Sequence, residues 1–147
     1  MMISTKGRYA LRLAIYIASQ QREGAEDVPV TMRQAAECED LSVKYLEQLG
    51  GAVVKAGVLK SLRGASGGYF LARPAAEITA GDVLRVAEGS CAPVACLLEE
   101  GGETCPRREE CVAVNFWRGL DQVIEGYVDS ISLADLVDMG WMPRSSC

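Results

Sequence analysis

The feature that most constrains the fold of this chain is a glycine-rich segment between two short apolar runs. Val58 to Leu62 and Tyr69 to Ala72 are typical of strands, because each is short and rich in β-branched, aromatic or aliphatic residues. The six residues between them, Arg63-Gly64-Ala65-Ser66-Gly67-Gly68, are typical of a turn. The sequence therefore predicts a β-hairpin in the middle of the chain.

Two short helical patterns come directly before this hairpin. Thr31 and Gln34 have the spacing of a capping box, which predicts a helix from about Met32. After a turn, Ser42 is placed to cap the next helix, and Gly57 suits a left-handed residue at its end. Two short helices with a tight turn between them, followed by a hairpin, predict a winged helix-turn-helix.

The rest of the chain is predicted to be helical on both sides of an irregular segment. A first helix starts after Ser4 or Thr5, and Thr79 caps another that runs to about Glu88. A long helix is predicted from Pro106 or Arg107 to Asp129, and a short one capped by Ser132 follows. The long helix carries an apolar stripe of Phe116, Leu120, Val123, Ile124, Tyr127 and Ile131. The fold class is mainly α with a small β-hairpin: a winged helix-turn-helix plus a long C-terminal helix.

The charge of the chain is divided unevenly between its halves. Residues 1–73 contain ten Lys and Arg against seven Asp and Glu, whereas residues 74–147 contain five against thirteen. A basic N-terminal half suits contact with DNA phosphates, even though the total net charge is −5. With no apolar run long enough to cross a bilayer and no signal-peptide pattern, we expect a cytoplasmic location.

The second helix of a helix-turn-helix lies in the major groove and presents its first residues to the bases. The candidates in this helix are Ser42, Lys44, Tyr45, Glu47 and Gln48. Gln48 could make a bidentate pair of hydrogen bonds with adenine, and Glu47 could accept a hydrogen bond from the cytosine amino group. Arg63, at the tip of the hairpin, could enter a minor groove. Lys6 is a candidate phosphate contact. Taken one at a time, these residues are equally compatible with solvated positions on a helical bundle, and only the whole set favours DNA binding.

Four of the six cysteines lie within one segment. Cys91, Cys96, Cys105 and Cys111 have the spacing C-x4-C-x8-C-x5-C. Thiolates suit iron–sulfur clusters or zinc, but structural zinc sites usually use close cysteine pairs or histidine, and this chain has neither such a pair nor any His. The spacing leaves open that the four thiols bind no metal or form a redox pair.

Several sequence blocks resemble the IscR/NsrR/RirA/CymR-type bacterial regulators. The blocks that carry this resemblance are Ile3 to Leu11, Ser42 to Leu49, Arg63 to Tyr69 and Ile131 to Leu136. The resemblance implies a homodimer, formed through the long helix with Phe116 and Trp117, on a partly palindromic DNA operator. It also implies that Ser42, Lys44, Tyr45, Glu47 and Arg63 match the family's DNA-reading residues.

The resemblance further implies an iron–sulfur cluster, [2Fe-2S] or [4Fe-4S], on Cys96, Cys105 and Cys111. The fourth ligand departs from the family: Val114 stands where one branch has His, and Arg8 stands where another has an acidic residue. We take Cys91 as the replacement. Three regions result: a winged helix-turn-helix at 1–88, a cysteine-rich sensor loop at 89–110, and a dimerisation helix with a short final helix at 111–147.

The expected function is a DNA-binding transcription regulator, a repressor, whose operator affinity depends on the cluster. The alternative is a regulator of the same family without a cluster, controlled by thiol redox, a metabolite or a partner protein. An enzyme is disfavoured, because the chain has no His to act as a general base and no nucleotide-binding loop: its glycine-rich turn joins two strands rather than opening a helix.

Overall fold

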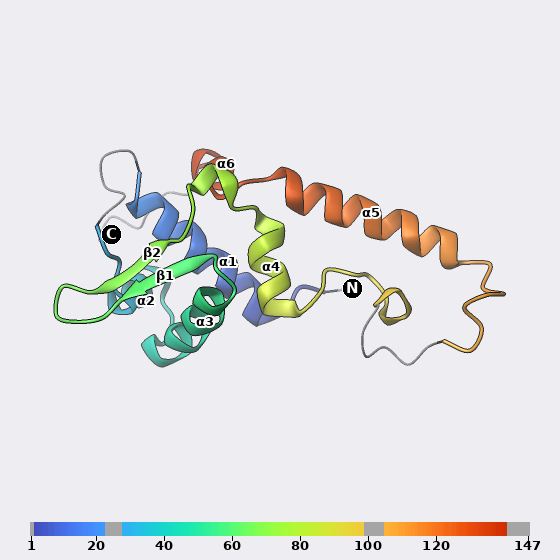
Figure 1. The fold of residues 1–147 in the computed structure, drawn as a ribbon, viewed down its shortest axis with the longest axis horizontal. Coiled ribbons are helices and arrows are strands. Elements are labelled where there is room, and N and C mark those ends of the chain that lie inside the picture. The colour runs from blue at the N-terminus through green and yellow to red at the C-terminus, as the bar shows by residue number, and fades with distance from the viewer. Residues whose placement is uncertain (1, 23–27, 99–104, 141–147) are drawn as a thin grey trace.

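The fold is described from a computed structural model that covers residues 2–22, 28–98 and 105–140. Its longer elements are helices, with one two-stranded antiparallel sheet between them (Figure 1). In chain order the elements are α1 (Thr5–Gln20), α2 (Met32–Glu39), α3 (Val43–Lys55), β1 (Leu59–Leu62), β2 (Gly68–Leu71), η1 (Ala75–Glu77), α4 (Ala80–Glu88), η2 (Ala95–Leu97), α5 (Val114–Ser130) and α6 (Leu133–Asp138). The predicted fold class is confirmed.

Side-chain caps fix where the helices begin. Ser4 accepts a hydrogen bond from the Gly7 backbone N–H at the start of α1, and Ser42 does the same for Tyr45 at the start of α3. Helices α2, α4 and α6 also begin at side-chain caps, and each of them has a complete capping box. Each such cap provides an acceptor for an otherwise unpaired N–H, so the sequence alone predicted these starts within one residue.

The helices α2 and α3 form the helix-turn-helix. Asp40, in the turn between them, has a φ of 55°, a left-handed conformation that Asp tolerates better than most residues. Helix α1 supports this pair through Arg12, which donates hydrogen bonds to the side chain and the backbone carbonyl of Glu39 at 2.6 and 2.7 Å. The turn is therefore held from outside as well as by its own backbone.

The hairpin forms the wing. Its strands pair from Leu59 with Leu71 to Leu62 with Gly68. Val30, just before α2, makes an isolated antiparallel bridge to Tyr69, with N–O distances of 3.0 and 2.8 Å. The wing is thus hydrogen-bonded to the start of the helix-turn-helix and has a fixed position beside it.

One core runs through the N-terminal domain. It contains the buried faces of α1, α2, α3 and α4, centred on fully buried side chains such as Leu13, Ile17, Leu46 and Val83. Helix α6 also reaches this core, because Leu133 is fully buried in it and Val137 packs beside it. Backbone hydrogen bonds from Ala80 to Ile131 and from Leu133 to Ile78 fasten α6 to the start of α4.

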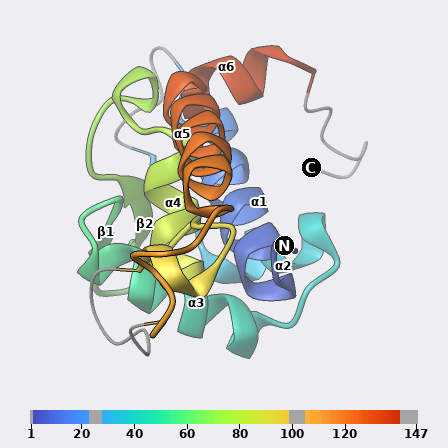
Figure 2. The same cartoon turned by 90° about the vertical axis from the view of Figure 1, so that its right-hand side faces the viewer.

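Helix α5 differs from the other helices because it projects away from the domain (Figure 1), and Figure 2 views it nearly end-on in front of α4. None of its side chains is buried. The prediction that it begins at Pro106 or Arg107 is wrong: it begins at Val114, and residues 106–110 form turns. These five residues are all exposed, so no packed apolar face stabilises a helix there.

Candidate nucleic-acid interface

The first turns of α3 present a polar surface. Lys44, Glu47 and Gln48 are all exposed, and Ser42 is exposed at the N-cap. Ser42 Oγ accepts the hydrogen bond from the Tyr45 N–H at 3.1 Å, so its hydroxyl proton stays available to donate to another group. The opposite face of α3, with Leu46, Leu49 and Val53, is buried in the core. The helix therefore turns Ser42, Lys44, Glu47 and Gln48 outward, whereas Tyr45 is half-buried.

Tyr45 has a packing role that the sequence did not indicate. Its half-buried ring lies edge-to-face against Tyr9 of α1, with ring centroids 5.9 Å apart. The Arg12 guanidinium lies 5.4 Å from the centre of the Tyr9 ring and also pairs with Glu39. Tyr9, Arg12 and Tyr45 thus join α1 to both helices of the helix-turn-helix. Tyr9 and Arg12 share one face of α1 at i and i+3, but no pattern in the sequence indicates that Tyr45 of α3 contacts them.

The wing carries Arg63 just after the end of β1, where it is exposed beside Gly64, whose φ is 112°. Only glycine adopts such a backbone conformation without strain, so the tight turn at the wing tip depends on it. Between the wing and the first turns of α2 and α3 lies a groove of about 520 Å³. Of the predicted DNA-binding residues, Glu47 and Arg63 both line this groove.

Lys6 lies in the first turn of α1, also exposed. This end of α1 is fastened to α4, because the Glu88 carboxylate accepts hydrogen bonds from the backbone N–H and the hydroxyl of Ser4, at 3.1 and 2.6 Å. Gly7 makes that contact possible, since a Cβ at this position would lie 2.1 Å from the Glu88 oxygen. Glu88 was not among the sequence-predicted residues.

The four candidate metal ligands are free thiols. Cys96, Cys105 and Cys111 are half-buried, and Cys91 is buried with 7% of its surface exposed. Within the ranges that the structure covers, no three Cys, Asp or Glu side chains are grouped closely enough to hold a metal ion. The structure therefore does not bring the four sulfur atoms together.

Cys91 lies where α4 meets α5. Burial raises the pKa of its thiol above the ordinary value, nearby Glu125 raises it further, and the positive charge of Arg85 opposes them. Arg85, on α4, donates hydrogen bonds to the carboxylates of Glu125 and Asp129 on α5. The bond to Asp129 is the main cause that raises the pKa of Arg85. These pairs hold α5 to the domain beside the cysteine-rich segment.

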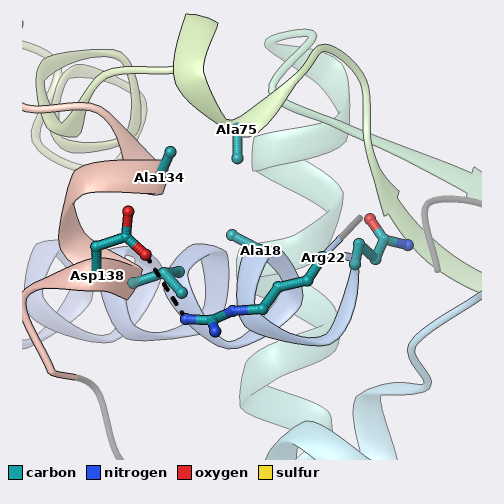
Figure 3. Close-up of a pocket in the computed structure, with 7 residues that line it drawn as sticks. Ala18, Arg22, Ala75, Ala134 and Asp138 are labelled. Carbon is teal, nitrogen blue, oxygen red and sulfur yellow. Dashed lines mark ion pairs between the residues drawn. The ribbon is translucent and has the colours of Figure 1, made fainter. Parts of the chain in front are cut away.

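A separate surface hollow of about 310 Å³ lies between the end of α1, η1 and α6 (Figure 3). Arg22 and Asp138 face each other across it, with 3.8 Å between their charged atoms. Its other lining residues include Ala18, Ala75 and Ala134. None of the predicted DNA-binding residues or metal ligands lines this hollow.

The fold and the outward polar face of α3 define a winged helix-turn-helix protein. Comparison with known families identifies the branch: the Rrf2 family, described as an iron-dependent transcriptional regulator, matches residues 3–139. The chain belongs to the Rrf2 family of transcriptional regulators, a class that binds DNA.

Individual relatives agree with this assignment. The chain is 40% identical over 136 residues to the HTH-type transcriptional regulator CymR of Bacillus subtilis, covering 92% of this chain and 89% of CymR. It is 35% identical over 138 residues to the regulator IscR of Serratia proteamaculans, covering 94% of this chain and 80% of IscR. The solved structure of T. potens IscR superposes with a TM-score of 0.72 at 36% identity, covering 99% and 95% of the two chains. No helix in the part of the chain described here is long and apolar enough to span a membrane.

Proposed function

We propose that this regulator binds an operator as a homodimer, with α3 in the major groove and the wing in the adjacent minor groove. The observation that carries the proposal is the position of the exposed polar turns of α3 directly beside the wing that bears Arg63. A recognition helix with a hairpin held at its side matches the docking geometry of helix-turn-helix proteins with an accessory minor-groove contact.

Each predicted side chain has a role that its chemistry supports. Gln48 suits a bidentate pair with adenine, and Glu47 suits the amino group of cytosine. Ser42 donates its free hydroxyl proton, and Tyr45 contributes the exposed part of its half-buried side chain. The remaining contacts are made by charged side chains. Lys6 and Lys44 contact phosphates, and Arg63 enters the minor groove.

Dimerisation is proposed through α5. Phe116, Val123 and Tyr127 expose 64%, 69% and 66% of their surface. They recur at i, i+7 and i+11, so they share one face of the helix. An apolar face of this kind on a projecting helix is stabilised when it packs against the same face of a second copy. In this proposal residues 1–88 bind DNA, residues 89–110 sense the signal and residues 111–147 form the dimer.

The signal is proposed to be the state of an iron–sulfur cluster. Four free thiols in one segment fit the donor chemistry of such a cluster, although the structure does not group them. The half-buried residues Cys96, Cys105 and Cys111 are the first three ligands, and Cys91 is the fourth. Because burial raises the pKa of the Cys91 thiol, binding there has to displace a proton that the surroundings retain.

The cluster, when bound, would tie the thiolates of the segment between α4 and α5 into one unit. Residues of this chain carry the effect further: Arg85 links α4 to α5, and Glu88 links α4 to the N-cap of α1. A change in the order of the cysteine-rich segment therefore alters the support of both the proposed dimer helix and the domain that contacts DNA. In this proposal the protein is a cytoplasmic repressor whose affinity for its operator depends on the cluster.

The DNA proposal is tested by selecting duplexes from a random pool with the full-length protein and measuring affinity by fluorescence anisotropy at fixed salt. Gln48→Ala and Lys44→Ala are expected to weaken binding, and Gln48→Ala is also expected to relax the base preference. Glu77→Gln, an exposed change on η1, serves as the control. If the unmodified protein enriched no sequence and bound duplex DNA no better than an unrelated acidic protein, the proposal would be wrong.

The cluster proposal is tested on anaerobically purified protein, by its visible spectrum with iron and sulfide assays and by operator affinity with and without the cluster. The unmodified protein is expected to be coloured and to contain equal amounts of iron and sulfide. Cys96→Ser, Cys105→Ser and Cys111→Ser are each expected to lose the cluster and its colour. An unchanged cluster in Cys91→Ser would exclude Cys91 as a ligand. Colourless protein that resists reconstitution would leave DNA binding in place and favour thiol redox, a metabolite or a partner protein as the signal.

A further inference from the structure

The groove between α3 and the wing contains an arginine that the sequence analysis did not select. Its lining comes from the first turn of α2, the first turns of α3 and the wing. Arg33 contributes from α2, Glu47 from α3, and Ser61 and Arg63 from the wing. All four side chains are exposed. The groove therefore joins the two structures that the proposed function places in neighbouring DNA grooves.

The shape of this groove is fixed by backbone contacts. The Val30–Tyr69 bridge fastens the wing to the residues just before α2. Gly68 allows the close approach, since a Cβ there would lie 2.8 Å from the Val30 carbonyl oxygen. On the side of α3, Met32 and the Tyr69 ring pack against Gly50. The two walls of the groove consequently keep their separation without help from a bound partner.

Three of the six arginines of the N-terminal half, Arg33 among them, have no carboxylate partner within the described ranges. The arginines with such partners form the pairs Arg12–Glu39, Arg22–Asp138 and Arg73–Asp82. Arg8 and Arg63 resemble Arg33 in this respect, but of these three arginines only Arg33 and Arg63 line the groove. Two arginines against the one carboxylate of Glu47 give the groove lining a net positive charge. An unpaired arginine on a fixed groove wall is suited to an anion, because its guanidinium presents parallel N–H donors.

The geometry of DNA identifies that anion. A major groove and the adjacent minor groove are separated by one sugar–phosphate strand, so a protein with a helix in one and a hairpin in the other must pass that strand between them. In this chain the space between α3 and the wing is the groove that Arg33 lines. We propose that Arg33 binds the phosphate backbone that separates the two DNA grooves. This inference rests on the proposed function.

The role assigned to Arg33 is positioning, since a phosphate contact carries no base identity. By holding the strand in the groove, Arg33 sets the distance of α3 from the base edges. It also offsets the repulsion between Glu47 and the phosphates, because both side chains line the same groove.

The test compares Arg33→Gln with Arg22→Gln in the full-length protein. Arg22 is exposed too, but it lines the separate hollow with Asp138, away from the groove. The probes are a duplex selected from a random pool by the unmodified protein and a scrambled duplex of equal length. Arg33→Gln is expected to lower affinity about tenfold on both duplexes at moderate salt, because phosphate contacts act on any sequence. Arg22→Gln is expected to bind like the unmodified protein.

Salt dependence gives a second readout. The slope of the logarithm of the DNA association constant against the logarithm of the salt concentration is negative, and each lost phosphate contact makes it less steep by about 0.9. A dimer that loses two contacts should therefore have a slope less steep by roughly 1.8. An unchanged slope and affinity in Arg33→Gln would overturn the inference, and so would a loss confined to the selected duplex, which would indicate base reading. If the unmodified protein bound neither duplex, the proposed function would fail instead.

A phosphate scan separates a lost contact from a folding defect, because a folding defect would weaken binding to every substituted duplex rather than remove the sensitivity at one phosphate. Single methylphosphonate substitutions neutralise one phosphate at a time in the selected duplex. The unmodified protein is expected to lose affinity at a phosphate between the two grooves, and Arg33→Gln is expected to be insensitive at that same phosphate. If both proteins showed equal sensitivity at every position, Arg33 would have no phosphate contact.

Discussion

At the scale of single residues, the neighbouring glycines Gly50 and Gly51 of α3 differ in their surroundings. Gly50 is buried, and a Cβ there would lie 2.3 Å from the Met32 methyl carbon and 3.4 Å from the Tyr69 ring. Gly51 is exposed, with nothing within 4 Å of an added Cβ. The first glycine lets the helix approach α2 and the wing, while the second only adds backbone freedom that opposes helix formation.

Alanine at these two positions is expected to have opposite effects on stability. Gly51→Ala should stabilise the protein by about 0.5–1 kcal/mol, through helix propensity alone. Gly50→Ala should destabilise the protein by about 1 kcal/mol, because the cost of displacing Met32 and the Tyr69 ring exceeds the same gain in helix propensity. Urea unfolding followed by circular dichroism measures both. Equal stabilisation by the two variants would show that Gly50 has no packing function.

Asp82 provides a residue-scale prediction of pH dependence. Burial by itself raises the pKa of this carboxyl, but hydrogen bonds from the Thr79 N–H and from Arg73, with the charge of Arg73 and Arg85, lower it below the ordinary 3.8. A carboxyl with a lowered folded-state pKa stabilises the protein above its unfolded-state pKa, and this stabilisation is lost as the pH falls through the folded-state value.

Asp82→Asn is therefore expected to be less stable than the unmodified protein at pH 7, by up to about 1 kcal/mol, and the difference should disappear well below pH 3.8. Urea unfolding at a series of pH values measures it. Asp40→Asn, at an exposed left-handed position that Asn also tolerates, is the control. A stability difference that grew toward low pH would contradict the sign of this linkage.

At the scale of elements, α4 connects regions that are far apart in the sequence. Arg85 contacts α5, Glu88 contacts the N-cap of α1, and Cys91 follows three residues later. Gly81 gives the Arg85 pair its space, because a Cβ at this position would lie 2.1 Å from Asp129 Oδ1. Since α5 has no buried side chain, the ion pairs with α4 are a large part of what holds it in place.

Gly81→Ala is expected to turn the Asp129 carboxylate away from Arg85 and to loosen the attachment of α5. Backbone hydrogen exchange at the α4–α5 contact should then become faster. Arg85→Gln is expected to have the same effect, because it removes the ion pairs that Arg85 makes with α5. Gly119→Ala on α5 is a matched control, since an added Cβ there meets nothing within 4 Å. Unchanged exchange in both Gly81→Ala and Arg85→Gln would mean that the ion pairs do not hold α5.

At the scale of the whole molecule, the apolar residues are divided between a closed core and an open helix. The core of the N-terminal domain is complete in one chain, with α6 covering its edge. The face of α5 that bears Phe116, Val123 and Tyr127 is not covered by any other described element. A single chain therefore completes the packing of its N-terminal domain but leaves this face of α5 uncovered.

Val123→Glu is expected to produce a monomer, because it places a charge in the proposed apolar interface, and a monomer should bind a partly palindromic operator at least tenfold more weakly. Light scattering after size-exclusion chromatography measures the mass. Gln122→Glu adds the same charge at the adjacent position outside the apolar face and should remain dimeric. A dimeric Val123→Glu protein would show that dimerisation uses another surface.

The sequence by itself determined the features that depend only on neighbouring residues. Helix starts at Ser4, Thr31, Ser42, Thr79 and Ser132 are local properties, because a capping side chain bonds backbone groups within three residues of itself. The turn of the wing is local for the same reason, since it depends on the left-handed φ of Gly64. The outward position of Lys44, Glu47 and Gln48 followed from the helical period of the apolar residues Leu46, Leu49 and Val53.

Only the tertiary structure decided the features that depend on distant residues. These include the place of α6 in the core, the α4 contacts of Arg85 and Glu88, and the groove that joins Arg33 to the wing. It also decided where α5 begins, since residues 106–110 lack any packed face to stabilise a helix. Such contacts pair residues tens of positions apart, and their geometry is set by the packing of whole elements, which no local pattern of residues encodes.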